Sequence, residues 1–267
     1  MLRKKLSEES IEKDYEYPLL ESDKFKLVTD INIDESCNLY CASCRNQVII
    51  DRSEWKQRLT ESVIEQVLPE TEILFMAGNG EVFASSYYKQ ILHARQYKKI
   101  IGIMILSNGN ICKKDEWDYI TNMVGGNVHV SFSVDAATEK TYCKLRRGGD
   151  FKKVEANIRY VCNLKRHGKV RCVALNFVMQ RENYRELEDF VIWGKELGVD
   201  YFNITYLENW GTWTEEEFLE KCMYQTEKNP CRELQEEIKK IKKYGDCILL
   251  DDAYRYRQIA YSILKNF

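Results

Sequence analysis

Short apolar runs alternate with longer amphipathic stretches along most of the chain. The runs at residues 26–33, 72–77, 102–106, 128–134, 170–178 and 201–206 have the apolar character of strands. Stretches with helical spacing lie at 61–68, 85–97, 114–123, 151–166 and 185–197. Strands that alternate with helices of this length predict right-handed βαβ crossovers and a parallel sheet. Six such units predict an α/β fold, a partial (β/α)6 TIM-like barrel.

No stretch rich in glycine, serine or proline divides the chain. The alternation instead predicts an N-terminal extension at 1–25, a core domain at 26–209, and a short, mainly helical C-terminal extension at 210–267. Within this extension, residues 233–243 form a strongly charged amphipathic stretch, which is typical of a solvated helix.

Several predicted strands alternate apolar and polar residues, although strands buried on both faces are usually apolar throughout. In the fourth strand, valines and a phenylalanine occupy one face, and His129, Ser131 and Ser133 occupy the other. Asn176 and Asn203 interrupt the next two strands. Two interpretations remain open: a curved sheet whose inner face lines a polar, ligand-holding cavity, or polar groups that hydrogen-bond within the core.

Composition excludes some classes of partner. Charged residues make up 31% of the 267 residues, but the net charge is only -2, so no basic excess indicates nucleic-acid binding. No apolar run approaches the roughly 20 residues needed to span a bilayer. The first twenty residues are charged and lack the apolar centre of a signal peptide. We therefore expect a cytoplasmic protein with neither a nucleic-acid nor a membrane partner, whose ten cysteines stay reduced.

Residues 34–46 read DESCNLYCASCRN and follow the first predicted strand, where active-site loops of barrels lie. Their cysteines, Cys37, Cys41 and Cys44, are spaced C-x3-C-x2-C, so their thiolates can converge on one inorganic centre. Three ligands on a 4Fe–4S cluster leave one iron open for a second cofactor. Structural zinc sites prefer four ligands, and Cys112 or another distant cysteine could complete such a site.

The C-x3-C-x2-C motif after a first strand resembles the radical S-adenosylmethionine (SAM) superfamily, in particular its SPASM-type and peptide-modifying branch. The resemblance covers approximately residues 26–209. It implies an enzyme that binds SAM at a 4Fe–4S cluster held by the three cysteines. Further segments at successive strand ends match the family's order of SAM-binding motifs: Gly78, Asn79, Gly80, Glu81, Ser107, Asn108, Ser133, Asp135, Arg146 and Asn176.

The resemblance also implies roles for these residues. Glu81 and the glycines before it would lie against the amino group of SAM, and Arg146 would pair with the SAM carboxylate. Ser133 and Asp135 would lie near the ribose and the carboxylate, and Asn176 near the adenosine or the substrate. The chain departs from the family at Ser43, where an aromatic residue often packs near the adenine. We expect Tyr40 to take over that contact.

By resemblance, one-electron reduction of the cluster cleaves SAM to a 5′-deoxyadenosyl radical, which abstracts hydrogen from a substrate C–H bond. The resemblance implies an oxidoreductase or an isomerase of the epimerase type, and a donor such as flavodoxin or ferredoxin. A peptide or protein side chain is the favoured substrate, and a carbohydrate or other small metabolite is the alternative. A non-catalytic module that binds zinc or an iron–sulfur cluster belongs to a different class. The choice between epimerisation, oxidation and cross-linking stays open.

The remaining cysteines give weaker signals. Cys222, Cys231 and Cys247 could hold an auxiliary cluster, as in SPASM enzymes, but the dense cysteine run of a SPASM domain is absent. We therefore favour ordinary reduced cysteines. Three further cysteines lie within predicted framework elements and are interpreted as packing residues: Cys143, Cys162 and Cys172.

Overall fold

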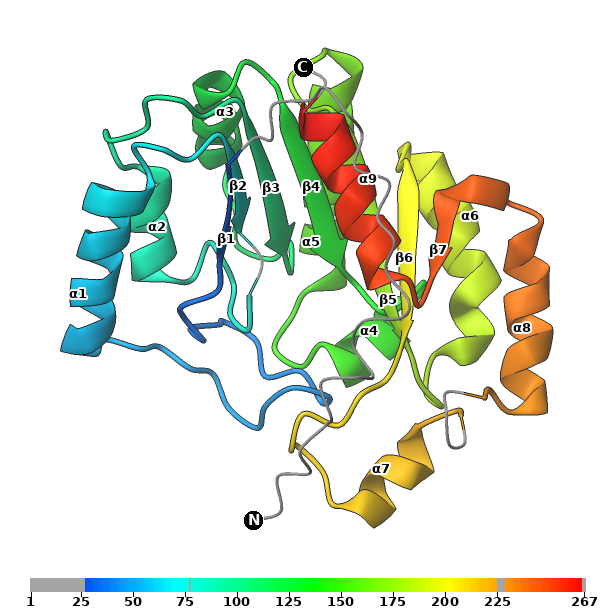
Figure 1. Ribbon diagram of the computed structural model, residues 1–267. Coiled ribbons are helices and arrows are strands. Elements are labelled where there is room, and N and C mark those ends of the chain that lie inside the picture. Colours follow the sequence, from blue (N-terminus) through cyan, green and yellow to red (C-terminus); the bar gives the residue numbers. More distant parts are fainter. Residues whose placement is uncertain (1–26, 77, 225–228, 266–267) are drawn as a thin grey trace, which may run out of the picture.

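The computed structural model describes residues 27–76, 78–224 and 229–265. Parallel strands form one sheet in sequential order (Figure 1). The seven strands are β1 (Val28–Ile31), β2 (Ile73–Met76), β3 (Gly102–Ser107), β4 (Val128–Ser133), β5 (Cys172–Met179), β6 (Tyr201–Tyr206) and β7 (Ile248–Leu250). The predicted α/β class and the open, partial barrel are confirmed.

Helices connect the strands. They are α1 (Glu54–Ser62), α2 (Ser86–Leu92), α3 (Lys114–Met123), α4 (Glu139–Leu145), α5 (Phe151–Arg166), α6 (Leu187–Leu197), α7 (Glu215–Lys221), α8 (Arg232–Lys242) and α9 (Ala253–Lys265). A π-helical turn (Val63–Val67) extends α1, and short 3-10 turns lie at Tyr184–Glu186 and Gly245–Cys247. None of the helices in the described segments has the length and apolar character needed to cross a bilayer.

The two faces of the sheet bury different sets of side chains. The main core joins one face to the crossover helices, with Val130 and Phe132 of β4 packed against Trp117 and Val154. The opposite, inner face packs on α9, which crosses it in Figure 1 with α5 behind the sheet. The alternation predicted along β4 thus separates a face under the crossover helices from a face under α9.

The C-terminal extension contributes more than the predicted helices. β7 pairs in parallel with β6 and completes the sheet. α9 then lays Ala260 and Leu264 on an inner-face cluster that includes Phe75 and Met104. The sequence analysis expected six strands. The seventh was missed because it has only three residues and no amphipathic pattern. The predicted N-terminal extension, residues 1–25, lies outside the described residues.

The polar side chains on the inner face of the sheet lie in two different surroundings. His129 is buried at the α9 end, where its ring lies edge-on to the Tyr256 ring with centroids 5.8 Å apart. Further along, the Asn176 side-chain amide donates to the Ser131 hydroxyl at 2.8 Å, and the Asn203 side-chain amide donates to Asn176 Oδ1 at 2.9 Å. At the carboxyl ends of the strands this face opens onto a cavity.

Candidate active site

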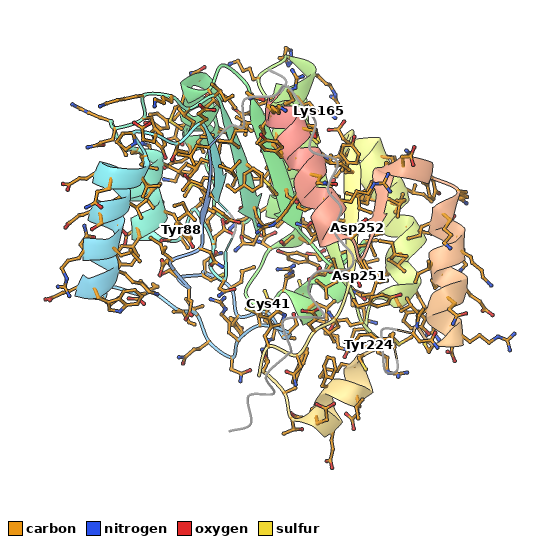
Figure 2. All side chains as sticks on the ribbon, in the orientation of Figure 1. Cys41, Tyr88, Lys165, Tyr224, Asp251 and Asp252 are labelled. Carbon is orange, nitrogen blue, oxygen red and sulfur yellow. The ribbon has the colours of Figure 1, made fainter. Side chains whose placement is uncertain are left out.

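A cavity of about 700 Å³ lies at the carboxyl ends of the strands. Residues from the ends of all seven strands, or from the loops that follow them, contribute to its wall. Figure 2 shows Cys41 and Asp251 at this end of the sheet and Lys165 at the opposite end. Parallel strands bring their carboxyl ends to one edge, so the loops that the sequence analysis singled out converge there.

The three cysteines of the C-x3-C-x2-C motif all line this cavity, on the loop between β1 and α1. The loop, residues 34–51, is called the cluster loop below. Its ends are held by a β-bridge, in which Cys37 N–H donates to the Ile49 carbonyl at 2.8 Å. Its middle bonds to the end of α4, where Tyr40 N–H donates to the Arg147 carbonyl at 3.1 Å. A turn from Cys41 to Cys44 brings the last two cysteines together, with an N–H to carbonyl distance of 3.0 Å.

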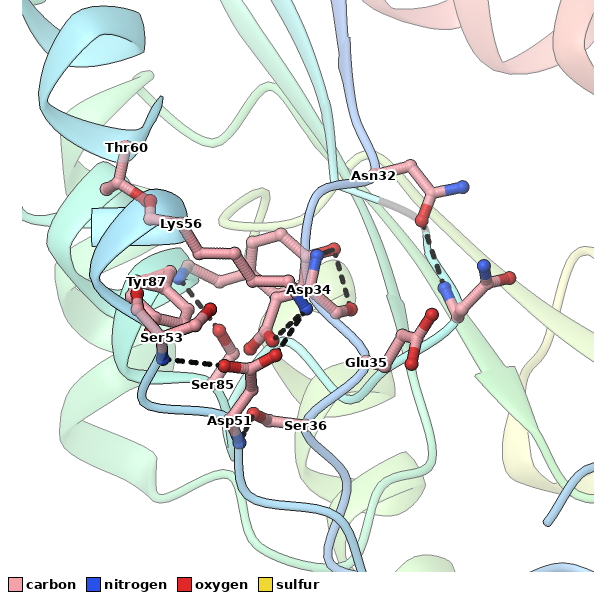
Figure 3. Close-up of polar contacts among 12 residues, drawn as sticks. Asn32, Asp34, Glu35, Ser36, Asp51, Ser53, Lys56, Thr60, Ser85 and Tyr87 are labelled. Atoms are coloured by element: carbon pink, nitrogen blue, oxygen red, sulfur yellow. Dashed lines mark hydrogen bonds and ion pairs between the residues drawn. The ribbon is translucent and has the colours of Figure 1, made fainter. Parts of the chain in front are cut away.

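A buried cation joins the two ends of the cluster loop to α1 (Figure 3). The Lys56 ammonium lies 3.3 Å from Asp34 Oδ1 and 2.7 Å from Asp51 Oδ2. The hydrogen bond from Lys56 lowers the pKa of Asp51 to about 2. Asp51 N–H in turn donates to the Ser36 hydroxyl at 2.8 Å. The loop that carries the cysteines is therefore fixed at both ends by a charge network.

Glu81 is fully buried beside the cysteines and organises the turn after β3. Its carboxylate accepts from the Ser107 hydroxyl at 2.7 Å and from Asn108 N–H at 2.6 Å. Burial raises the pKa of Glu81, and the hydrogen bond from Asn108 N–H opposes that rise. Its Oε1 also accepts from Phe83 N–H at 3.3 Å, so these three bonds leave Glu81 about one of the roughly four lone-pair sites of a carboxylate.

Gly80 lies in the loop that follows β2, here called the β2 loop, at the point where this loop crosses the cluster loop. A Cβ at this position would lie 2.6 Å from the Ser36 carbonyl oxygen and 2.7 Å from that of Asp34. The next residue, Glu81, donates its N–H to the same Ser36 carbonyl at 2.8 Å. The sequence analysis assigned the glycines of this loop to the approach of a ligand. The structure shows that Gly80 allows two loops of the protein to meet.

Arg146 and Asp135 form a buried ion pair at 2.7 Å, with side-chain exposures of 14% and 3%. Burial tends to lower the pKa of Arg146, and the Asp135 carboxylate outweighs that effect, so the guanidinium stays charged. Asp135 has a left-handed backbone, with φ of 63°, which costs a non-glycine residue about 1–3 kcal/mol. Its second oxygen accepts from Val178 N–H, and Asn183 donates to its carbonyl, both at 2.9 Å.

Most of the predicted SAM-binding residues line the cavity together with the cysteines. These are Gly78, Asn79, Gly80, Glu81, Ser107, Asn108, Ser133 and Arg146. Asp135 and Asn176 do not line it, because Asp135 supports Arg146 from behind and Asn176 bonds to Ser131. Tyr40, expected near the adenine, is also outside the lining. Its ring lies 5.3 Å from the Arg147 guanidinium, whereas Ser43 does line the cavity.

The sequence analysis missed several residues of the wall. Arg45, directly after the third cysteine, donates to the Cys44 sulfur from both Nε and Nη2 at 3.2 Å. Glu208, Trp210 and Asp251 form part of the wall beyond β6 and β7. Arg45 had an available signal, because it adjoins the motif. Asp251 had none, since the strand before it was not predicted.

The residues present fit an iron–sulfur cluster. Three thiols reach one cavity whose wall also carries a carboxylate and a guanidinium. Burial raises the pKa of the Cys37 and Cys41 thiols, which a bound metal would deprotonate. Among the described residues, no three histidine, cysteine or acidic side chains are arranged to hold a single metal ion. In a 4Fe–4S cluster each thiolate binds its own iron, so the sulfurs stand further apart.

The other cysteines lie away from this cavity. Cys112, weighed as a fourth zinc ligand, is packed in the main core. Cys222 packs with Leu207 and Phe218, and Cys231 and Cys247 border the main core. Among the described residues, these last three do not line the cavity that holds Cys37, Cys41 and Cys44. Cys143 is exposed on α4.

A family model described as the radical SAM superfamily matches residues 31–193. The match covers more than half of the chain, so this chain belongs to the radical SAM superfamily. The cofactors of this superfamily are a 4Fe–4S cluster and SAM. A search of curated protein sequences found no match.

Solved structures share the fold at low sequence identity. SuiB from Streptococcus suis, bound to SAM, has a TM-score of 0.54 and 16% identity over 85% of this chain and 50% of SuiB. SuiB bound to its precursor peptide SuiA has a TM-score of 0.55 and 14% identity over 91% of this chain and 51% of SuiB. Native anSMEcpe with bound AdoMet has a TM-score of 0.51 and 16% identity, over 89% and 66% of the two chains. The chain therefore spans about half the length of SuiB.

Proposed function

We propose that this chain binds a 4Fe–4S cluster through Cys37, Cys41 and Cys44, and uses SAM to abstract hydrogen from a C–H bond of a peptide. The observation that carries the proposal is the meeting of these three cysteines with Glu81 and Arg146 in one cavity. When bound, the cluster and SAM supply reductive cleavage to a 5′-deoxyadenosyl radical. The protein itself binds the cluster and SAM, orients the substrate and shields the reaction from water.

The charged groups of the cavity suit the two ends of an amino acid. Glu81 has acceptor capacity for an ammonium group, and Asn79 and Gly80 place backbone groups beside it. Arg146, held by Asp135, presents a guanidinium edge to the cavity beside Cys41, with Nη1 3.8 Å from the Cys41 sulfur. Arg146 lines the cavity, and its charged guanidinium suits a carboxylate there.

A peptide is the favoured substrate for two reasons. SuiB, which shares the fold, is known bound to a precursor peptide. The far wall of the cavity, beyond β6, also mixes a carboxylate and aromatic rings, with Tyr206, Glu208 and the largely exposed Trp210. A carbohydrate or other small metabolite is the alternative. The described lining contains no cysteine besides the three ligands, so Cys143 and Cys172 are not placed as hydrogen donors for an epimerisation.

The decisive experiment is anaerobic reconstitution with iron and sulfide, followed by SAM and a strong reductant. We expect about four irons per chain and formation of 5′-deoxyadenosine. Replacing the three cysteines by alanine together should remove both, whereas Cys143→Ala and Cys112→Ala should keep both. Zinc in place of iron under strict exclusion of oxygen, or an intact cluster without 5′-deoxyadenosine, would refute the proposal. Candidate peptides and sugars can then be compared by deuterium transfer into 5′-deoxyadenosine.

A further inference from the structure

The three cysteine sulfurs differ in their hydrogen-bond donors. The Cys37 sulfur accepts from Leu39 N–H at 3.5 Å and from Asn108 Nδ2 at 3.8 Å, and the Cys41 sulfur accepts from Arg146 Nη1 at 3.8 Å. The Cys44 sulfur accepts two N–H groups of the Arg45 guanidinium, each at 3.2 Å. Cys44 is also the exposed member of the three. Among the described residues, the shortest donations to the three sulfurs therefore come from one guanidinium and go to the sulfur that solvent would otherwise reach.

The guanidinium of Arg45 is fixed by groups on both sides. Its Nη1 donates to the Glu35 carbonyl at 2.5 Å, and its Nη2 also donates to the Asn79 carbonyl. These acceptors belong to the loops after β1 and β2. At its backbone, the Arg45 carbonyl accepts from Arg147 Nη2 at 3.1 Å. Because these hydrogen bonds hold the planar guanidinium of Arg45 in place, its N–H groups stay directed at the Cys44 sulfur, whereas the guanidinium of a free surface arginine would move.

We propose that Arg45 tunes the reduction potential of the cluster by donating both N–H groups to the Cys44 sulfur. The inference rests on the proposed function. Reduction adds one electron, taken from an external low-potential reductant such as dithionite or a reduced flavoprotein, and makes the cluster more negative by one charge. No bond is broken and no proton moves. Hydrogen bonds and positive charge at a ligand sulfur favour the more negative form, so Arg45 raises the potential.

The test is a redox titration of the reconstituted protein without SAM, followed by EPR of the reduced cluster. Arg45→Gln removes the charge and the fork, and at a fixed solution potential the ratio of reduced to oxidised cluster should fall about tenfold, a midpoint lower by about 59 mV. Arg45→Lys keeps the charge but loses the doubled donation and should give a smaller fall. Lys144→Gln removes an exposed cation that pairs with Glu182 and should leave the midpoint unchanged.

Each outcome decides between roles for Arg45. An unchanged SAM-free midpoint in Arg45→Gln with full iron content overturns the inference, and a change in SAM affinity alone would assign Arg45 to SAM binding. Loss of the cluster in both Arg45 variants would assign it to assembly and also overturn tuning. A wild-type protein that takes up no cluster would instead sink the proposed function, which the iron and sulfide analysis shows before any titration.

Discussion

At the scale of single residues, Lys56 is a buried cation paired with two carboxylates. Its ammonium lies between Asp34, whose side chain is fully buried, and Asp51. Lys56→Met would leave the Asp34 carboxylate buried without a counter-charge. We expect the free energy of unfolding to fall by about 3 kcal/mol, as for other broken buried pairs. Urea denaturation followed by circular dichroism measures this loss.

Lys99 provides the matched control, because its ion pair with Glu70 is exposed on both sides. Lys99→Met should cost less than about 1 kcal/mol. Equal losses in the two variants would show that the buried network adds nothing beyond an ordinary surface pair.

Gly80 should be the glycine of the β2 loop least tolerant of a side chain. In Gly80→Ala the new methyl group would collide with two backbone carbonyls of the cluster loop, so the loops must separate. We expect iron uptake on reconstitution to fall several-fold and the free energy of unfolding to fall by about 1–3 kcal/mol. Iron analysis and thermal unfolding report the two effects.

Gly168→Ala serves as the comparison. Gly168 has a positive φ, of 71°, but a Cβ there would meet no atom within 4 Å. Gly168→Ala should lower the free energy of unfolding slightly through backbone strain and leave iron uptake at the wild-type level. Normal iron uptake in Gly80→Ala would show that the loop crossing does not shape the cluster site.

The sequence indicated which residues gather at the cavity, but it did not indicate the hydrogen bonds and ion pairs that those residues make with one another. The spacing of the three cysteines was sufficient to place them together, because they share one short loop. Glu81 was placed in the right cavity, but its bonds to Ser107 and Asn108 depend on where the β3 loop lies in space. Asp135 was assigned to the ligand, and in the structure it pairs with Arg146 without lining the cavity. Contacts between separate loops leave no periodic signal in a single sequence.

At the scale of elements, α9 covers a histidine that the sequence analysis had placed on a polar face. Both ring nitrogens of His129 are buried without a partner among the described residues. Burial lowers the pKa of His129 to about 4, from 6.5. Below pH 6.5 the unfolded chain therefore takes up a proton that the folded chain refuses, and stability falls as the pH falls toward 4.

The lowered pKa of His129 predicts a measurable difference in pH dependence between the wild type and a variant without the histidine. Each pH unit in that interval costs about 1.4 kcal/mol. Between pH 7.5 and 5, the loss of unfolding free energy should be smaller by about 2 kcal/mol in His129→Leu than in the wild type. Urea titrations at the two pH values test this. An identical pH dependence in the two proteins would mean that His129 is protonated in the fold.

The predicted elements succeeded where their apolar runs were long. α5 and α3 begin and end where the spacing indicated, and β4 and β6 match within a residue or two. The helix predicted at 61–68 instead begins at Glu54, because α1 is mostly polar and its apolar spacing is weak. β7 and α4 are too short to give a pattern, and only their neighbours in space define them.

At the scale of the whole molecule, the segments on the two sides of the boundary predicted at residue 209 pack against each other. β7 bonds to β6, and α9 covers the inner-face residues Phe75 and Met104. A chain that ends at residue 209 would expose this apolar face. We expect it to aggregate or to unfold without cooperativity, as measured by light scattering and thermal denaturation. A soluble fragment with a sharp transition would show that the predicted core domain folds alone.

The cluster loop is tied at its ends by Lys56 and the Cys37–Ile49 bridge, and in its middle by the end of α4. None of these ties involves iron, so the thiols are gathered before any metal arrives, and little of the binding energy is spent on ordering the chain. A chelator should then strip the iron and leave circular dichroism and the melting temperature nearly unchanged. A cluster destroyed by oxygen could be rebuilt on the same folded polypeptide.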